Sequence, residues 1–157
     1  MGNTLALRKL AACLAALLVW FALAVPAPAA PLGAGDGLIA ADAALRGAEA
    51  DNLTVIDVRS PGEWRQTGLP KGARAVTIHD PGGIEGFVAA MKRAVGGRLD
   101  APVALICARG GRSTRAQQAL RGAGFTRVMN IREGMLGSSY GPGWLKRGLP
   151  VEVCSGC

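Results

Sequence analysis

Several residue types are scarce in this chain of 157 residues, and each shortage narrows the range of functions. Aromatic residues make up only 4% of the sequence, and no basic stretch has aromatic residues interleaved in it, so we predict no nucleic-acid binding. The single histidine, His79, follows a predicted strand and is expected to face a loop. A lone histidine argues against a Ser/His/Asp triad and against a multi-histidine metal site, so we predict no bound metal. Acidic residues are also few, 11 against 18 basic ones, and the resulting net charge of +7 suits an anionic partner.

Charge is absent from one long stretch near the start of the chain, residues 10–25, which follows Arg8 and Lys9. Small residues and prolines come next, and Ala27-Pro28-Ala29 fits the A-x-A pattern of a cleavage site. A basic start, a short apolar segment and small residues at the cut are typical of a secretory signal. We therefore predict a signal peptide over residues 1–29 and a periplasmic or secreted protein.

Two other interpretations of this stretch involve the membrane. An uncleaved anchor would leave the protein facing outside the cytoplasm, and only in that case do we expect it to contact a membrane, although the stretch is shorter than a span of about 20 residues. Lipidation at Cys13 is disfavoured, because most of the apolar residues follow that cysteine rather than precede it. Residues 30–37 are predicted to form a flexible leader.

Four cysteines are present, and Cys13 would be lost with the signal. The remaining three are Cys107, Cys154 and Cys157, and an odd number in an oxidising compartment suggests one pair and one free thiol. Cys154 and Cys157 are separated by two residues and are a candidate disulfide. Cys107 is then the candidate reactive thiol.

Apolar runs and helix periodicity alternate along the rest of the chain. Strands are predicted over 38–39, 53–58, 75–78, 103–106, 128–131 and 151–153, the last as a small edge strand. Helices are predicted over 41–50, from Pro61 through Trp64, over 84–95 and over 113–122, with a last helical turn over 144–147. This alternation predicts an α/β fold with a small parallel β-sheet flanked by helices on both faces.

A cationic, glycine-rich turn follows the predicted strand 103–106, and it begins at Cys107. In an open α/β sheet this place is the carboxyl edge, where ligands bind. Gly110 and Gly111 allow the backbone N–H groups to face inward, and a helix expected to be capped by Ser113 or Thr114 points its positive end at the turn. Arg109 and Arg112 add positive charge, so the thiolate form of Cys107 is favoured and we expect a nucleophile rather than an inert buried thiol.

Several ordered motifs resemble the single-domain rhodaneses, a family of sulfurtransferases. Residues 55–64, VIDVRSPGEW, are similar to the family's DVR-x-x-x-E-[YFW] segment, and residues 69–73, LPKGA, to its I-P-G-A turn. Residues 107–113, CARGGRS, match the C-x-x-G-x-R-S form of the active-site loop. Gly134, Trp144 and residues 148–151 fit the closing G…W…G-x-P-V segment. The resemblance covers residues 38–153 and leaves a CxxC tail at 154–157.

The resemblance implies a rhodanese-like fold and an enzyme that moves a sulfane sulfur, with no cofactor. Cys107 would take the outer sulfur of a small anionic donor such as thiosulfate and pass it from a persulfide to cyanide or a thiol. Loop N–H groups would surround that sulfur, and Arg112, with Arg109 in a less certain role, would attract the donor. Asp57 and Arg59 border the site in the family and are expected to be chiefly structural. The loop is formed by Cys107, Ala108, Arg109, Gly110, Gly111, Arg112 and Ser113.

Two other functions stay open at this stage. The first is a non-catalytic sulfur carrier or thiol-redox module, in which Cys154 and Cys157 resolve the Cys107 persulfide or pass on sulfur or electrons; an exposed disulfide is the simpler interpretation of that pair. The second, a Cys-dependent phosphatase, is disfavoured. Its loop has the form C-x5-R-[ST], whereas Arg112 gives only C-x4-R and no histidine precedes Cys107.

Overall fold

The computed structural model describes residues 37–154 and Cys157. The predicted signal over 1–29, and the predicted leader up to residue 36, lie outside the described residues. Within the described part of the chain, no helix is both long and apolar enough to cross a membrane.

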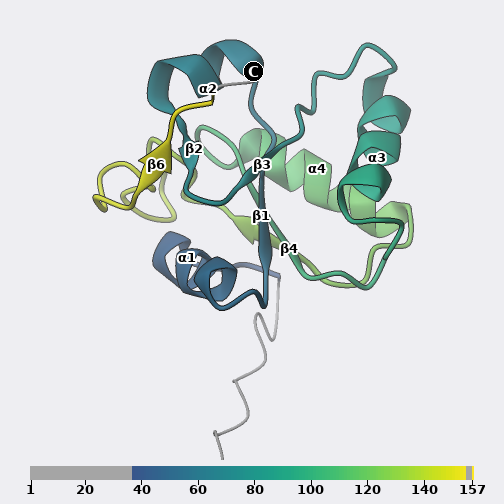
Figure 1. The fold of residues 1–157 in the computed structure, drawn as a ribbon, viewed down its shortest axis with the longest axis horizontal. Helices are drawn as coiled ribbons and strands as arrows, with labels where there is room; N and C mark the ends of the chain where they lie inside the picture. The colour runs from purple at the N-terminus through teal and green to yellow at the C-terminus, as the bar shows by residue number, and fades with distance from the viewer. Residues whose placement is uncertain (1–36, 155–156) are drawn as a thin grey trace, which may run out of the picture. The chain divides into compact units, whose positions relative to one another are not determined.

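A four-stranded parallel sheet forms the centre of the domain (Figure 1). Its strands lie in the order β3-β1-β4-β5, and each crossover between neighbouring strands is made by a helix-containing segment. The strands are β1 (Thr54–Asp57), β3 (Arg74–Ala75), β4 (Val103–Ile106) and β5 (Val128–Ile131). The helices are α1 (Ala41–Glu49), α2 (Pro61–Thr67), α3 (Gly83–Ala94) and α4 (Gly111–Gly122). The predicted fold class is therefore confirmed.

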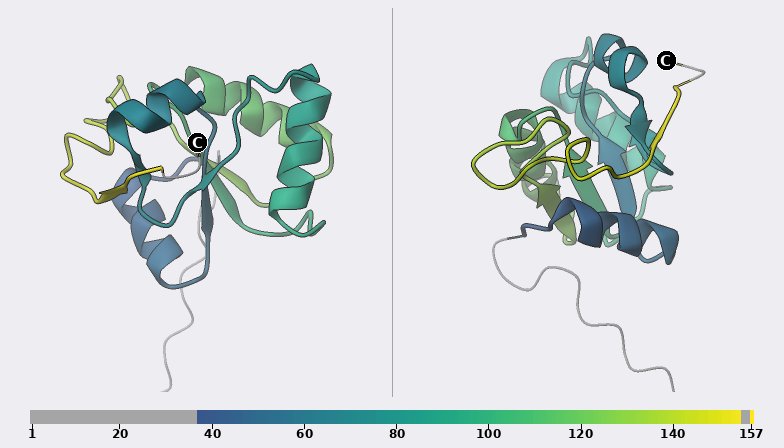
Figure 2. Two further views of the ribbon diagram at one scale, coloured as in Figure 1. Left: turned by 45° about the horizontal axis from the view of Figure 1, so that its top comes forward. Right: turned by 90° about the vertical axis from the view of Figure 1, so that its left-hand side faces the viewer.

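Helices cover both faces of the sheet, because each central strand is apolar on both sides. On one face, α3 and α4 pack Phe87, Met91 and Leu120 against alternate residues of β1 and β4. On the other face, α1 and the segment around Trp144 pack against the remaining strand residues. Figure 2 shows α1 and α3 on opposite sides of the strands.

Helix α2 begins at the carboxyl end of β1, and its start is set by the sequence. Ser60 and Glu63 form a capping box, and Pro61 occupies the first helical position, as their spacing predicts. The helix continues past Trp64 to Thr67, where Gly68 ends it with a positive φ of 76°. Trp64 and Trp144 are buried, as expected of packing residues.

Other elements differ from their predictions at their edges. The predicted strand 38–39 is a single bridge between Leu38 and Asn130, and β3 ends at Ala75, although Ile78 still donates a hydrogen bond to the Val58 carbonyl. The segment 144–147 forms hydrogen-bonded turns rather than a helix. These segments are too short for local periodicity to fix their conformation, so tertiary contacts decide it.

The last predicted strand pairs elsewhere than expected. β6 (Val151–Glu152) forms a separate antiparallel pair with β2 (Leu69–Pro70) and does not join the edge of the main sheet. Its partner, β2, directly follows α2. The C-terminal segment therefore lies beside the chain that immediately follows β1 and α2. A strand of two residues is too short to show an alternation of apolar and polar residues, so its pairing partner cannot be predicted from the sequence.

Candidate active site

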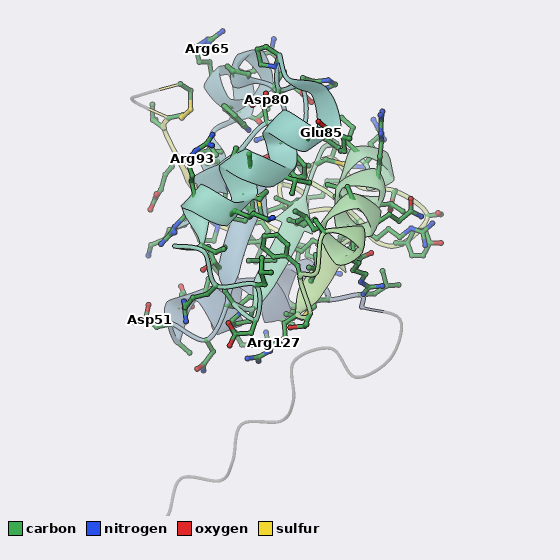
Figure 3. The ribbon with its side chains drawn as sticks, turned by 90° about the vertical axis from the view of Figure 1, so that its right-hand side faces the viewer. Asp51, Arg65, Asp80, Glu85, Arg93 and Arg127 are labelled. Carbon is green, nitrogen blue, oxygen red and sulfur yellow. A yellow bond between two sulfur atoms is a disulfide. The ribbon has the colours of Figure 1, made fainter. Side chains whose placement is uncertain are left out.

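Cys107 directly follows β4 and therefore lies at the carboxyl edge of the sheet. Figure 3 shows the two ends of the molecule: Asp51 and Arg127, which precede β1 and β5, lie at one end, and Arg65 on α2 lies at the other. Cys107 shares the end of Arg65, because both follow the carboxyl ends of parallel strands. Cys107 is only 1% exposed. The thiol is the only free cysteine among the described residues.

Two polar groups contact the Cys107 sulfur. The Gly110 N–H donates to Sγ at 3.2 Å, and the Ser113 hydroxyl lies 3.4 Å from it. The Ser113 hydroxyl also contacts the Gly110 carbonyl at 3.1 Å. A hydroxyl carries one hydrogen, so it can accept from a thiol while bonded to that carbonyl, or turn to donate to a thiolate. The sulfur therefore has one backbone N–H donor and one hydroxyl within hydrogen-bonding distance.

Helix α4 begins nearer to the cysteine than predicted. The expected cap, Ser113 or Thr114, is wrong: α4 starts at Gly111, and the N-cap is Gly110 in the left-handed region, with φ of 89°. The hydroxyls of Ser113 and Thr114 instead bond back to the Gly110 carbonyl from inside the first turn. The earlier start places the N-cap residue, Gly110, where its N–H donates to the Cys107 sulfur.

The segment after β5 braces the loop from outside. Met135 and Leu136 donate their N–H groups to the carbonyls of Cys107 and Ala108, at 2.8 and 2.9 Å. Gly134 allows this approach, because a Cβ there would lie 2.5 Å from the Ala108 carbonyl oxygen. A Cβ on Gly110 would likewise lie 2.2 Å from a main-chain oxygen, that of Arg132.

Arg112 does not stand free at the site. Its guanidinium forms a two-pronged ion pair with the Glu63 carboxylate on α2, with both N···O distances at 2.6 Å. Both side chains are 29% exposed. Hydrogen bonds from Arg112, then from Ser60, lower the pKa of Glu63 to about 2, although burial opposes the shift. The same pair raises the pKa of Arg112.

Arg59 and Asp57 form a second, fully buried pair at 2.7 Å. Arg59 also donates to Thr67 Oγ1 and to the Gly68 carbonyl, at 2.6 and 2.7 Å. These bonds hold the end of β1 against the end of α2. The contacts are those of a structural pair, and no described contact brings either side chain to the Cys107 sulfur.

The remaining loop residues differ in exposure. Ala108 is half-buried, Gly111 is exposed with open space around its Cα, and Arg109 is exposed with its guanidinium on the Gly137 carbonyl at 3.3 Å. Arg109 and Arg112 thus point to different neighbours. His79 is exposed in the loop after β3.

The two tail cysteines form no described hydrogen bond with the Cys107 loop. Cys154 and Cys157 are joined in a disulfide, and the Cys157 carbonyl accepts from Arg65 at 2.8 Å. Residues 37–154 and 157 contain no cluster of three or more His, Cys, Asp or Glu side chains able to hold a metal ion.

Sequence reasoning missed two parts of this site. Glu63 lies in the segment VIDVRSPGEW that resembles a family motif, but nothing in the local sequence identifies it as the partner of Arg112, which is 49 residues away. The bracing segment 134–136 was also missed. The only local sign of this contact is the glycine at position 134. A glycine alone does not show which carbonyl group it will pack against.

The loop after β4, braced by the segment after β5, places a buried cysteine at the start of a helix on an open parallel sheet. A family model described as a Rhodanese-like domain matches residues 40–138, so this chain belongs to the rhodanese-like family. A search of curated proteins finds an uncharacterized protein of Rickettsia prowazekii that is 26% identical over 104 residues, covering 65% of this chain and 85% of the relative.

Solved structures show the same fold. The rhodanese-like domain of an Anabaena protein superposes with a TM-score of 0.59 at 20% identity, covering 76% of this chain and 81% of the other. The human single-domain sulfurtransferase gives 0.52 at 20% identity, covering 64% and 92%. The polysulfide-sulfur transferase homodimer of Wolinella succinogenes gives 0.54 at 27% identity, covering 76% and 80%. The protein therefore has a rhodanese-like domain with sulfurtransferases among its structural neighbours.

Proposed function

We propose that this protein is a sulfurtransferase that moves a sulfane sulfur from thiosulfate, or a related anionic donor, to cyanide or a thiol through a persulfide on Cys107. The observation that supports this best is the setting of the Cys107 sulfur. It is buried, contacts the Gly110 N–H and the Ser113 hydroxyl, and lies at the start of α4. Each of these groups stabilises negative charge on sulfur.

The reaction has two displacement steps at sulfur. The Cys107 thiolate attacks the outer sulfur of thiosulfate, a new S–S bond forms, and the old one breaks with its electron pair leaving on sulfite. Cyanide or a thiolate then attacks the terminal sulfur, and the Cys107 thiolate leaves. Negative charge thus stays within the same loop in both steps, where fixed N–H donors need no reorganisation.

Mass spectrometry tests the first step. Protein incubated with thiosulfate should gain the mass of one sulfur, and the Cys107→Ser variant should not. A Cys107→Ser variant that gained that mass would exclude Cys107 as the carrier. A phosphate-ester assay on the same preparation tests the phosphatase alternative, for which we expect no turnover.

We also propose that the protein acts outside the cytoplasm, on the sequence evidence of the signal over 1–29. The intact mass of protein recovered from a periplasmic fraction should correspond to cleavage after Ala29. Recovery only in the membrane fraction at full mass would support the anchor instead.

A further inference from the structure

The sulfur transfer proposed for Cys107 leaves the Cys154–Cys157 disulfide without a role. The two cysteines are three positions apart, so only two residues lie between them. Both follow β6, which is the last strand of the described chain. A disulfide stabilises a fold mainly by restricting the unfolded chain, and the effect grows with the length of the loop that it closes. This bond therefore closes a short loop and joins no two elements of the fold, as a structural disulfide would.

The disulfide is accessible to a reactant from solvent. Cys154 and Cys157 are half-buried, and the residue before them, Val153, is 90% exposed. Figure 3 shows the disulfide at the margin of the molecule, on the same side as Arg65. Exchange between thiols and disulfides begins with the attack of a thiolate on one of the two sulfurs, so its rate depends on access. The Cys154–Cys157 pair meets this requirement.

Arg65 gives the two sulfurs unequal surroundings. Its guanidinium donates to the Cys157 carbonyl at 2.8 Å, and it forms no ion pair with a side chain of the described residues. The acidic residue of β6, Glu152, instead lines a hollow with Lys71 and Arg74. A cation beside a cysteine favours its thiolate, and the sulfur that is the more stable thiolate is the better leaving group. Cys157 is therefore the leaving group when the disulfide opens.

Helix α2 directs the tail away from the Cys107 loop. Glu63 binds Arg112 of that loop, whereas Arg65 binds the tail, and residues two apart on a helix point in different directions. No described hydrogen bond joins residues 154–157 to the loop. The disulfide is therefore placed to react with a molecule from outside rather than with the Cys107 sulfur.

We propose that Cys154 and Cys157 form a second redox site, which exchanges with external dithiols independently of Cys107. The substrate class is a molecule with two neighbouring thiols. One substrate thiolate attacks Cys154 Sγ, a mixed disulfide forms, and the old S–S bond breaks with its electron pair leaving on Cys157. The second substrate thiolate attacks the substrate sulfur of the mixed disulfide, and Cys154 leaves. The dithiol loses two electrons and two protons, which the tail gains as two thiols.

Reduction by glutathione tests whether the disulfide is redox-active, because structural disulfides of secreted proteins resist the glutathione pool. Proteolytic cleavage after Arg147 releases residues 148–157, a peptide that contains both tail cysteines and not Cys107. Mass spectrometry of this peptide after alkylation of the folded protein gives the reduced fraction. In a large excess of reduced over oxidised glutathione we expect at least half to be reduced, with the urea midpoint unchanged. A disulfide that stays oxidised until urea unfolds the protein would overturn the inference.

The rate of reduction by dithiothreitol tests the role of Arg65. Arg65→Gln should slow reduction about threefold, because the leaving thiolate loses its cation. The matched control is Arg127→Gln, which removes an exposed positive charge at the far end of the molecule (Figure 3) and should change the rate by less than about 1.5-fold. Equal slowing in the two variants would assign the effect to net charge and contradict the role of Arg65.

Three cysteine variants test the order of events and the independence from Cys107. The free Cys157 thiol of Cys154→Ser should react with iodoacetamide about threefold faster at pH 7 than the free Cys154 thiol of Cys157→Ser. Faster reaction at Cys154 would reverse the assignment of the leaving sulfur. Cys107→Ser should be reduced by dithiothreitol at the wild-type rate, and slower reduction would refute independence. These measurements follow the tail alone, so they hold whether or not Cys107 forms a persulfide.

Discussion

At the scale of single residues, the Ser113 hydroxyl links the cysteine to the loop that surrounds it. It contacts both the Cys107 sulfur, at 3.4 Å, and the Gly110 carbonyl, at 3.1 Å, and its single hydrogen can point to either one. No other described side chain forms a hydrogen bond with that sulfur. Ser113 is therefore the side chain whose removal should affect the thiolate most directly.

The Ser113→Ala variant should lower kcat/KM for thiosulfate about five- to tenfold, which is the loss of about 1 kcal/mol of stabilisation at a developing charge. Thr114→Val is the control, because Thr114 also donates to the Gly110 carbonyl, at 2.8 Å, but does not contact the sulfur; its stability is measured as well, since it also loses the bond from Asn130. Single-turnover release of sulfite measures the effect. Equal losses in the two variants would show that the loop's shape, and not the contact with sulfur, is what Ser113 provides.

Gly134 packs so closely against the backbone of the Cys107 loop that there is no room for a side chain at this position. Its φ is 69°, and an added Cβ would lie 2.5 Å from the Ala108 carbonyl oxygen. Gly134→Ala should therefore destabilise the fold by about 2–4 kcal/mol and displace the loop. The control is Gly72→Ala, which has a similar φ of 71° but open space around it, and should cost about 1 kcal/mol.

Urea unfolding measures both glycine variants, and sulfite release measures the loop. A Gly134→Ala protein as stable and active as Gly72→Ala would contradict the role of the close approach. The comparison separates backbone strain, which the two positions share, from the steric contact found only at Gly134.

At the scale of elements, the Glu63–Arg112 pair joins the first turns of α2 and α4. Both helices begin at the carboxyl edge, so this pair fixes the spacing of the two elements that flank Cys107. The pKa of Glu63 is held at about 2, below its value in an unfolded chain. The contribution of the pair to stability is therefore complete at neutral pH and is lost as the carboxylate is protonated.

Stability should fall as the pH is lowered from about 5 toward 2, by about 1–2 kcal/mol from this pair once solvent screening is allowed for. Urea unfolding of the wild type and of Glu63→Gln at pH 7 and pH 3 measures this. The variant should show a smaller dependence on pH. Asp42→Asn, which breaks an exposed pair with Arg46, is the control and should alter the dependence less. A Glu63→Gln protein that lost stability in acid as the wild type does would contradict the assignment.

At the scale of the whole molecule, the two ends of the described chain are fixed to the same sheet by polar contacts. The buried Glu133 carboxylate accepts from the Ala41 N–H on α1, from the Gly143 N–H and from Arg147, at 2.8 to 2.9 Å. Burial raises the pKa of Glu133, but these hydrogen bonds outweigh it and hold the pKa below its usual value. The C-terminal segment is thus anchored before it reaches β6.

Beyond β6, the disulfide-linked tail contacts the outer side of α2. Arg65 binds the Cys157 carbonyl, whereas Glu63 faces the loop, and residues two apart on a helix point in different directions. Deletion of residues 154–157 should therefore change sulfur transfer to cyanide by less than about twofold. Cys154→Ser/Cys157→Ser is the companion variant, which removes the disulfide and keeps the chain length. A tenfold loss in both would favour the alternative in which the tail takes part in sulfur transfer.

The amino-acid sequence by itself was sufficient for the features that depend on local pattern. Strands β1, β4 and β5 were predicted because their runs are continuously apolar, and the start of α2 because Ser60, Pro61 and Glu63 are a complete local signal. The placement of Cys107 at the carboxyl edge followed from these elements. The family could also be predicted, because each of its motifs is a short continuous segment of the sequence.

Tertiary structure alone decided which groups meet across long separations. Local propensity favoured Ser113 or Thr114 as the cap of α4. In the fold Gly110 caps the helix in the left-handed region, because a residue without Cβ can take that φ and pack against the Arg132 carbonyl after β5. The sequence places the positive charges of both Arg109 and Arg112 in the turn after Cys107. Only the fold brings Glu63 to Arg112 and leaves Arg109 free of a carboxylate in the described chain, because an ion pair depends on distance in space and not on position in the sequence.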